Sequence, residues 1–329
     1  MNLYWPTRFI CSIAGLIFVG VGVFAATSMP TPEQGVIQGI DRFEFTYRVK
    51  LPEITKAGQL WLPLAKTDAF QTVEVKEITT PSQWKKIQDR DYGNNILLLS
   101  PSPSESGKIV EIRYQVSRLQ KEAYAGKDAK VEQYLHPERL VPLNETFKSI
   151  ALEKTKNKKG DLERGKALYD HVFQTMRYDK SGTGWGRGDA IYACNTLTGN
   201  CTDFHAYFIA LARSIGIPAR FAIGATIPSD KNEGSIGGYH CWAEFFAEGR
   251  WVPVDISEAS KKPELADYYF GHQPANRFEL SAGRDLVVEP GPVAGPINFL
   301  VYPVLEVDGK IIETKAEFSF RRTRPSSGS

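Results

Sequence analysis

Apolar and polar residues alternate in several short runs in the first third of the chain. Residues 43–49, 72–76 and 110–116 each place apolar side chains at every second position, which is the period of a strand with one buried face. Turn-forming residues at 92–95 and 101–104 separate these runs. The pattern predicts a β-sandwich-like domain over residues 29–135. Residues 39–118 contain no cysteine and no histidine, so we assign this domain a packing or substrate-presenting role.

Helical spacing begins farther along the chain. A helix opening near Asp161 carries Leu168, Val172, Phe173 and Met176 on one face. A second helix, starting near residue 201, carries an apolar stripe at 204, 208, 211, 212 and 215 and is ended by Gly216 and Pro218. We place these helices in a second domain, residues 136–289.

The C-terminal part again reads as strands. Residues 299–307 and 316–320 are apolar runs that flank Asp308-Gly309, a hairpin signal. We predict a C-terminal β hairpin and tail over residues 290–329, packed against the core or against the N-terminal sheet.

The first 28 residues differ from the rest of the chain. One base, Arg8, precedes an apolar run over residues 9–26 that ends in small residues, as in a secretory signal. The run is also near the lower limit for spanning a bilayer. We therefore expect an exported protein, periplasmic or extracellular, whose residues 1–28 are a signal peptide or an N-terminal anchor that attaches it to the membrane through residues 9–26.

Composition narrows the classes of function. The 329 residues are enough for two domains, and 42% of them are hydrophobic. The 40 Lys and Arg residues nearly balance the 38 Asp and Glu residues, which argues against a nucleic-acid partner bound by a basic face. Four cysteines are too few for a disulfide-dense scaffold.

Cys201 stands at the start of a predicted helix. Asn200 is a good N-cap, and Asp203 is placed as in a capping box. Cys201 then lies in the first turn, where unpaired backbone N–H groups and the helix dipole favour a thiolate. The same N–H groups could stabilise a developing oxyanion.

A base and an orienting acid are available on a predicted hairpin that turns near Glu248-Gly249. Two pairing registers are plausible, and both place His240 and Asp255 on one face, either opposite one another or one diagonal apart. His240 could therefore bridge Cys201 and Asp255 as a Cys-His-Asp triad.

Four sequence blocks carry a resemblance to a known family. They are Gly-Asn-Cys-Thr-Asp-Phe at 199–204, Ile-Gly-Ile-Pro-Ala-Arg at 215–220, Tyr-His-Cys-Trp-Ala-Glu at 239–244 and Gly-Arg-Trp-Val-Pro-Val-Asp at 249–255. Together they resemble the transglutaminase-like superfamily over about residues 138–285. The resemblance implies that residues 136–289 are a papain-like α+β core, with Cys201 as nucleophile, His240 as base and Asp255 as orienting acid.

The resemblance also suggests the reaction. It implies acyl transfer or hydrolysis at a carboxamide or peptide bond through a thioester, and it is greatest to exported bacterial members with a sandwich-like domain before the core. The substrate would be a protein or peptide, and cell-wall peptides suit that compartment. The calcium sites of animal members have no counterpart in this sequence, and we expect no metal and no cofactor. The auxiliary oxyanion donor of the family falls on either Trp185 or Asn195.

Several residues have plainer alternative roles. His205 is expected to be a hydrogen-bonded helix residue rather than a second base, and Trp242 and Trp251 to be core or cleft-wall aromatics. The glycine loop, residues 182–188, lacks the ending of a phosphate-binding loop. Arg284 and Asp285 are expected to form a local ion pair.

The cysteines leave two alternatives open. Cys194 and Cys241 could pair in a disulfide, or Cys194, Cys201, His240 and Cys241 could form a zinc site, although no Cys-x-x-Cys pair is present. A different class of function also stays open. The chain could be a non-catalytic binding or assembly module that retains the transglutaminase-like scaffold.

Overall fold

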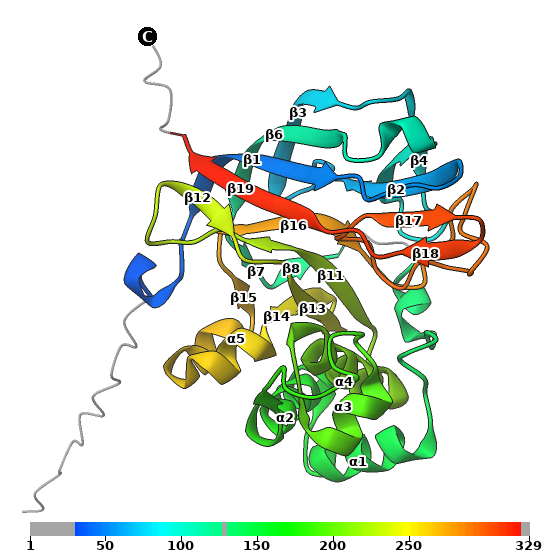
Figure 1. Ribbon diagram of the computed structural model, residues 1–329. Coiled ribbons are helices and arrows are strands. Elements are labelled where there is room, and N and C mark those ends of the chain that lie inside the picture. The colour runs from blue at the N-terminus through cyan, green and yellow to red at the C-terminus, as the bar shows by residue number, and fades with distance from the viewer. Residues whose placement is uncertain (1–29, 127–129, 324–329) are drawn as a thin grey trace, which may run out of the picture.

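The computed structural model describes residues 30–126 and 130–323. The predicted signal peptide or anchor, residues 1–28, lies outside this part of the chain. Within the described residues, no helix has the length and apolar character needed to cross a membrane. Figure 1 shows a layer of antiparallel strands packed against a mixed layer of strands and helices.

Two five-stranded antiparallel sheets form the first layer. Alternate residues of β1 are buried, as the sequence predicted. The first sheet has the order β12-β19-β1-β6-β3, with β1 at Ile40–Lys50, β3 at Gln71–Thr79, β6 at Ile109–Leu119, β12 at Glu233–Ile236 and β19 at Ala316–Arg322. The second has the order β18-β17-β2-β5-β4, with β2 at Gly58–Leu64, β4 at Trp84–Gln88, β5 at Asn95–Leu99, β17 at Val304–Val307 and β18 at Lys310–Ile312.

These sheets combine segments that are distant in sequence. The C-terminal β19 lies between β1 and β12, with Phe45 opposite Phe320 and Ile236 opposite Phe318. The C-terminal strands therefore pair directly with N-terminal ones, and the core contributes β12 to the same sheet (Figure 1).

The predicted C-terminal hairpin is only partly correct. Asp308 and Gly309 do form its turn, both with positive φ, but the strand that follows is β18 rather than residues 316–320. Residues 316–320 instead continue into β19, because Phe318 packs against the aromatic rings of Phe45 and Tyr47 on β1. Burial of these rings across the sheet favours this pairing over a longer hairpin.

The second layer is built on a third five-stranded sheet, β16-β11-β13-β14-β8. Its strands are β8 at Tyr124–Ala125, β11 at Ala219–Thr226, β13 at His240–Ala247, β14 at Arg250–Val254 and β16 at Arg277–Ala282. Two strand pairs are smaller, β9 at Arg177–Tyr178 with β10 at Thr198–Gly199, and β7 at Lys121–Glu122 with β15 at His272–Gln273.

Helices surround the third sheet. They are α1 at Glu145–Thr155, α2 at Gly160–Thr175, α3 at Ala190–Thr196, α4 at Cys201–Ser214, α5 at Ile256–Lys261 and α6 at Ala266–Tyr269, with short 3-10 turns at Pro32–Gln34, Pro103–Glu105, Val131–Leu135 and Pro263–Leu265. The predicted helix near residue 161 is thus confirmed as α2, whose Leu168 and Val172 are buried. The arrangement confirms the α+β class, with N-terminal antiparallel sheets and C-terminal strands around the core.

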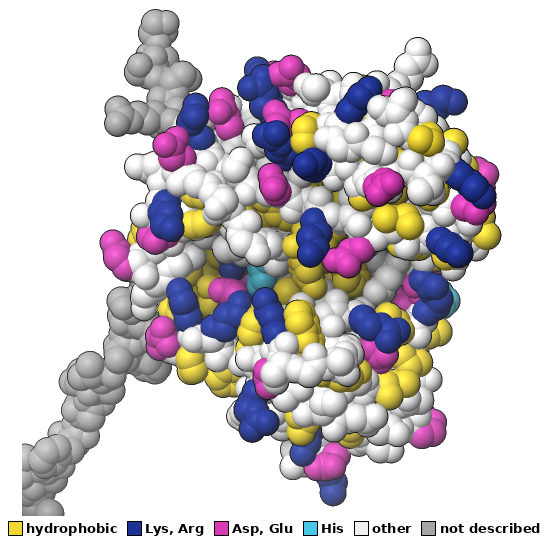
Figure 2. All heavy atoms as spheres, viewed as in Figure 1, with side chains coloured by type: hydrophobic (Ala, Val, Ile, Leu, Met, Phe, Trp, Pro, Cys, Tyr) yellow, Lys and Arg dark blue, Asp and Glu magenta, His cyan; other side chains and the backbone are white. Residues whose placement is uncertain are grey.

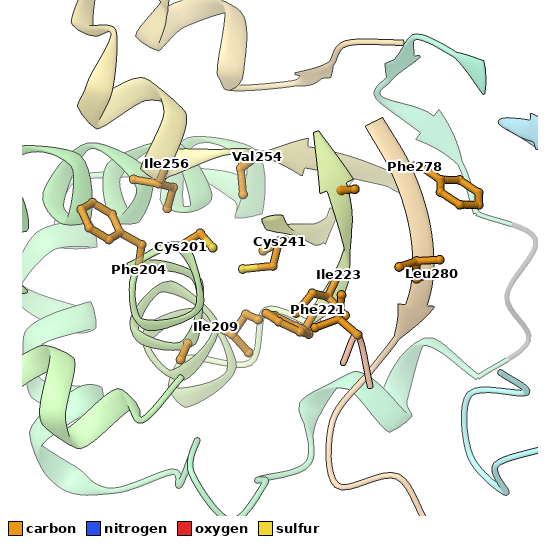
Figure 3. Close-up of a cluster of buried hydrophobic side chains, with 14 of the residues drawn as sticks. Cys201, Phe204, Ile209, Phe221, Ile223, Cys241, Val254, Ile256, Phe278 and Leu280 are labelled. Carbon is orange, nitrogen blue, oxygen red and sulfur yellow. The ribbon is translucent and has the colours of Figure 1, made fainter. Parts of the chain in front are cut away.

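Helix α4 is the centre of the second layer. The sequence predicted one apolar stripe on this helix, but every residue from Cys201 to Arg213 is buried. The reason is that α1, α2 and α3 pack around α4 while the sheet covers its remaining side. Figure 3 shows the side chains of α4 facing those of β11, β13 and β14. The first residue of α4 is thereby held at a fixed place against the sheet.

Candidate active site

Cys201 is the first residue of α4 and is only 2% exposed. The Asn200 side chain accepts a hydrogen bond from the backbone N–H of Thr202 at 2.9 Å, and the Asp203 carboxylate accepts one from the N–H of Asn200 at 3.0 Å. The predicted capping box is therefore present. It sets the start of the helix at the cysteine, which places the thiol at the positive end of the helix dipole.

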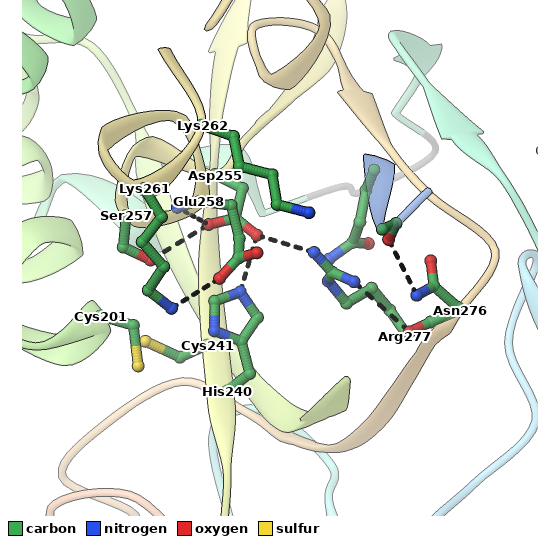
Figure 4. A network of polar contacts seen from close by, with 12 residues as sticks. Cys201, His240, Cys241, Asp255, Ser257, Glu258, Lys261, Lys262, Asn276 and Arg277 are labelled. Carbon is green, nitrogen blue, oxygen red and sulfur yellow. Dashed lines mark hydrogen bonds and ion pairs between the residues drawn. The ribbon is translucent and has the colours of Figure 1, made fainter. Parts of the chain in front are cut away.

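His240 and Asp255 lie next to one another at the end of the hairpin that carries them. The register pairs Ala243 with Val254, so Asp255 is one diagonal from His240, the second of the two predicted registers. His240 Nε2 is 2.7 Å from Asp255 Oδ2. The same ring is also a neighbour of the Cys201 thiol, and its charge lowers the thiol pKa. Figure 4 shows the ring lying between the carboxylate and the two sulfurs.

Charges in this buried group support one another. Burial opposes protonation of His240, but the Asp255 carboxylate outweighs it and raises the pKa of His240 to about 9. Burial also opposes ionisation of Cys201, yet hydrogen bonds from Cys241 and His240 and the charge on His240 hold the thiol pKa well below its usual range. The favoured state is a thiolate beside an imidazolium.

Asp255 is fully buried, and its oxygens have several partners. Burial opposes its ionisation, but His240 and Arg277 hold the pKa of Asp255 well below its usual range. Arg277 Nη2 on β16 lies 3.4 Å from Oδ2, and the Ser257 hydroxyl and the Glu258 N–H donate to Oδ1 at 3.2 and 3.1 Å. The carboxylate therefore both orients His240 and caps α5.

Arg277 was not found by sequence reasoning. It lies 22 residues beyond Asp255 in the chain, in a strand whose own pattern gives no sign of a charge contact. Its guanidinium is fully buried, and the compensating carboxylate comes from the N-cap of α5.

His205 acts as a structural link in this structure. Its Nε2 accepts a hydrogen bond from the backbone N–H of Ile256 at 3.2 Å, so the ring proton lies on Nδ1 and is donated to the Cys201 carbonyl at 2.8 Å. Burial lowers the pKa of His205, which keeps the ring neutral. The expected role of a hydrogen-bonded helix residue is thus the one observed, and it joins α4 to α5.

The cysteines do not form the disulfide that the sequence left open. Cys194, Cys201 and Cys241 are all free thiols. Cys194, on α3, lies beside Tyr207, whereas Cys241 lies beside Cys201. Among the described residues, no group of three or more His, Cys, Asp or Glu side chains is arranged to hold a metal ion.

The glycine loop is attached to the first turn of α4. Asp203 Oδ2 accepts a hydrogen bond from Gly186 N at 2.7 Å, and Oδ1 accepts one from Gly188 N at 3.0 Å. Arg284 donates to the Gly188 carbonyl at 2.6 Å. The expected local ion pair between Arg284 and Asp285 is therefore wrong.

Arg284 and Asp285, although adjacent in the chain, have different partners. Asp285 accepts a hydrogen bond from Arg139 Nε at 2.8 Å, whereas Arg284 donates to the glycine loop.

The glycine loop carries Trp185, one of the two predicted oxyanion donors. Trp185 is half-buried, and Lys180 Nζ lies 5.9 Å from the centre of its ring. Asn195, the other predicted oxyanion donor, is exposed on α3.

Aromatic residues surround the reactive group. Trp242 and Trp251 are buried, as expected for core residues, and the Trp242 ring lies 6.2 Å from that of His240. Tyr178 on β9 pairs with Gly199, directly before the start of α4, and its ring lies 4.1 Å from Lys261 Nζ. Tyr178 was not predicted from the sequence.

On the face seen in Figure 2, a hollow between the two layers contains apolar side chains and a histidine, with Lys and Arg along its lower rim.

Two known proteins are similar to this chain in sequence. An uncharacterized protein of Haemophilus influenzae is 26% identical over 90% of this chain and 94% of its own length. The uncharacterized protein YebA of Bacillus subtilis is 25% identical over 55% of this chain, but over only 28% of its own length.

A crystal structure of a proposed cysteine protease from Cytophaga hutchinsonii superimposes with a TM-score of 0.59 at 13% identity, covering 87% of this chain and 99% of that one. This likeness concerns the fold. A model of the transglutaminase-like superfamily matches residues 148–256, a stretch that includes Cys201, His240 and Asp255. Residues 148–256 are therefore a transglutaminase-like superfamily domain.

Proposed function

We propose that this protein is an exported thiol enzyme that uses Cys201, His240 and Asp255 to transfer an acyl group from a carboxamide or peptide bond. The observation that carries the proposal is the 2.7 Å contact between His240 and Asp255, with Cys201 on the other side of the ring at the start of a helix. Such an order of nucleophile, base and orienting acid is the arrangement that nucleophilic catalysis requires.

In the proposed reaction the Cys201 thiolate attacks the carbonyl carbon of the substrate. Thr202 N–H already donates to Asn200, and Asp203 N–H and Phe204 N–H donate to the Asn200 carbonyl. Within the described part of the chain, Cys201 N–H has no hydrogen-bond partner. This amide is the backbone donor best placed to stabilise the oxyanion.

His240 then gives its proton to the leaving amine, and a thioester on Cys201 remains. Asp255 keeps the imidazole in one orientation and stabilises its protonated form throughout. Water or an amine resolves the thioester, giving a hydrolase or a cross-linking enzyme. Peptides and proteins are the substrate class, and cell-wall peptides suit a protein exported by the apolar run at residues 9–26.

The test compares the purified full chain with the variants Cys201→Ala and Cys194→Ser on a glutamine-donor peptide, with and without an amine. Cys194 is the matched control because it is a half-buried thiol on the neighbouring helix. Amine incorporation that is lost only in Cys201→Ala would identify a transferase. Release of ammonia or cleaved peptide with the same dependence would identify a hydrolase.

Thiol labelling tests the proposal without knowledge of the substrate. An activated Cys201 reacts with iodoacetamide at a pH well below that at which an ordinary thiol reacts. Slow labelling of Cys201 at mildly acidic pH, together with inactivity on peptides, would contradict the proposal and favour the binding-module alternative.

A further inference from the structure

A second thiol lies beside the proposed nucleophile and has no part in the acyl-transfer reaction. Cys241 follows His240 on β13 and is fully buried. Its side chain belongs to the face of the sheet that packs against α4. Figures 3 and 4 both show its sulfur next to that of Cys201. The two residues come from different elements, so their proximity is a product of the fold.

The contacts of Cys241 fix its position. Its Sγ lies 3.6 Å from Nδ1 of His205, the same nitrogen that donates to the Cys201 carbonyl at 2.8 Å. The Cys201 thiol lies beside it where α4 packs against β13. His205 therefore holds the backbone of one cysteine and the side chain of the other, and the two sulfurs are held together in the closed interior.

The two thiols differ in ionisation. Cys201 is held as the thiolate, whereas burial and the neighbouring Cys201 charge raise the pKa of Cys241 well above its usual range. One sulfur is thus a nucleophile and the other a protonated thiol beside it. A low-pKa cysteine beside a second thiol is the arrangement in which oxidation ends in a disulfide rather than in a higher oxide.

We propose that Cys201 and Cys241 form a hydroperoxide-reactive pair, in which Cys201 is oxidised first and Cys241 resolves it as a disulfide. The Cys201 thiolate attacks one peroxide oxygen, the O–O bond breaks, and the departing hydroxide takes a proton from protonated His240 and leaves as water, giving a sulfenic acid on Cys201. The Cys241 sulfur then attacks the sulfenic sulfur. An S–S bond forms, and the displaced hydroxide leaves as a second water with the Cys241 proton. Two thiols are oxidised, and one hydroperoxide is reduced.

The disulfide would occupy the nucleophile and stop acyl transfer until a thiol reductant restored it. This inference rests on the reactive Cys201 of the proposed function, but its readout is a covalent change rather than acyl-transfer activity. Cys194 is the natural comparison because its partner is Tyr207 on α4 rather than another thiol.

The experiment treats the full-length protein with graded hydrogen peroxide and follows its intact mass, its disulfide-linked peptides and its rate of labelling by iodoacetamide. We expect the wild type to lose two hydrogen atoms, to yield a peptide linking residues 201 and 241, and to lose Cys201 labelling. Dithiothreitol should restore both mass and labelling. The Cys194→Ser variant should behave in the same way.

Removing the resolving thiol should change the product. In Cys241→Ala and Cys241→Ser, we expect two or three added oxygens on Cys201 and no recovery of labelling with dithiothreitol. Added oxygens on wild-type Cys201 without the 201–241 peptide would overturn the inference, and so would full recovery of both Cys241 variants.

The outcomes also separate this inference from the proposed function. Disulfide formation in a protein that shows no acyl transfer would leave the inference standing without support from the proposed function. Acyl transfer by a protein that never forms the disulfide would overturn the inference and leave the proposed function standing.

Discussion

Substitution of Asp255 by asparagine should convert the Cys201 thiolate to the neutral thiol in the folded protein. The carboxylate raises the pKa of His240 to about 9 from an ordinary 6.5, which corresponds to roughly 3 kcal/mol in favour of the protonated ring. Asparagine keeps the size of the side chain but removes this charge. The desolvation that remains favours a neutral ring, so near pH 6 His240 would lose its proton and Cys201 its counter-ion.

The size of the effect on Cys201 follows from thiol chemistry. At about pH 6 an ordinary thiol, with pKa near 8.5, is ionised to only roughly 0.3%, whereas the ion-paired Cys201 is ionised almost completely. This difference is about 300-fold in thiolate, and the lower nucleophilicity of a low-pKa thiolate offsets part of it. The net expectation is that Asp255→Asn slows labelling on the order of tenfold.

The assay is iodoacetamide labelling of Cys201 at about pH 6, followed by peptide mass spectrometry, with far-UV circular dichroism as a check on folding. Asp267→Asn, an exposed carboxylate on α6, is the matched control and should label at the wild-type rate. A folded Asp255→Asn protein that labels as fast as the wild type near pH 6 would refute the view that this carboxylate sustains the ion pair.

Three further outcomes follow from residues around the site. Glu244 is buried 2.7 Å from Lys121, and although burial opposes ionisation, Lys121 and a neighbouring arginine hold the pKa of Glu244 well below its ordinary 4.5. Because this folded-state pKa is depressed, its stabilisation is present above about pH 4.5 and is lost as pH falls below that value. The melting temperature of the wild type should therefore fall on acidification. Glu244→Gln removes the nearer of the two carboxylates beside buried Lys121 and leaves Glu279 at 3.9 Å, so it should destabilise the protein by up to about 3–5 kcal/mol and weaken that pH dependence. A Cβ added at Gly165 would lie 2.2 Å from the Phe245 ring, so Gly165→Ala should lower the free energy of unfolding in urea by about 1–3 kcal/mol despite its better helix propensity; an increase would contradict this packing. Asp203→Asn removes a carboxylate that accepts two N–H groups of the glycine loop, and limited proteolysis of that loop should accelerate; an unchanged cleavage rate would mean that other contacts hold it.

The parts of the site that the sequence predicted are those set by short-range rules. The capping residues Asn200 and Asp203 start the helix at Cys201 because their hydrogen bonds span three residues or fewer. The relation of His240 to Asp255 follows from one tight hairpin, and the period-two pattern left only two registers to choose between. Each of these signals involves residues that are close in the sequence, at one helix start or in one hairpin, so a local pattern can predict it.

The parts that the sequence did not predict depend on contacts between distant elements. Cys241 meets Cys201 only because β13 packs along α4, and a disulfide with Cys194 was equally consistent with the sequence. The pairing of β19 with β1 joins residues more than 250 positions apart. Arg284 looked like a partner for its neighbour Asp285, yet it lies buried against the glycine loop. The pattern of apolar and polar residues does not predict which distant carbonyl a buried guanidinium will contact.

One strand connects the N-terminal sheets to the proposed reactive group. On β16, Arg277 reaches Asp255, while the next residue, Phe278, packs 4.8 Å from the ring of Phe45 on β1. Neighbouring residues of a strand point to opposite faces. The backbone that Phe278 fixes against the first layer therefore also positions Arg277 beside Asp255 in the second layer. The N-terminal layer would then be a support for the acid as well as a packing module.

This view makes a measurable distinction. Phe278→Ala should cost about 3–5 kcal/mol of stability, and Leu98→Ala, in the separate core of the second sheet, about 2–5 kcal/mol. Only Phe278→Ala loosens the anchor of Arg277, which raises the pKa of Asp255 and weakens its hold on His240. We expect it to slow thiol labelling near pH 6 well beyond any effect of Leu98→Ala, under conditions where both proteins stay folded. Equal labelling rates in the two variants would mean that the acid is positioned by the second layer alone.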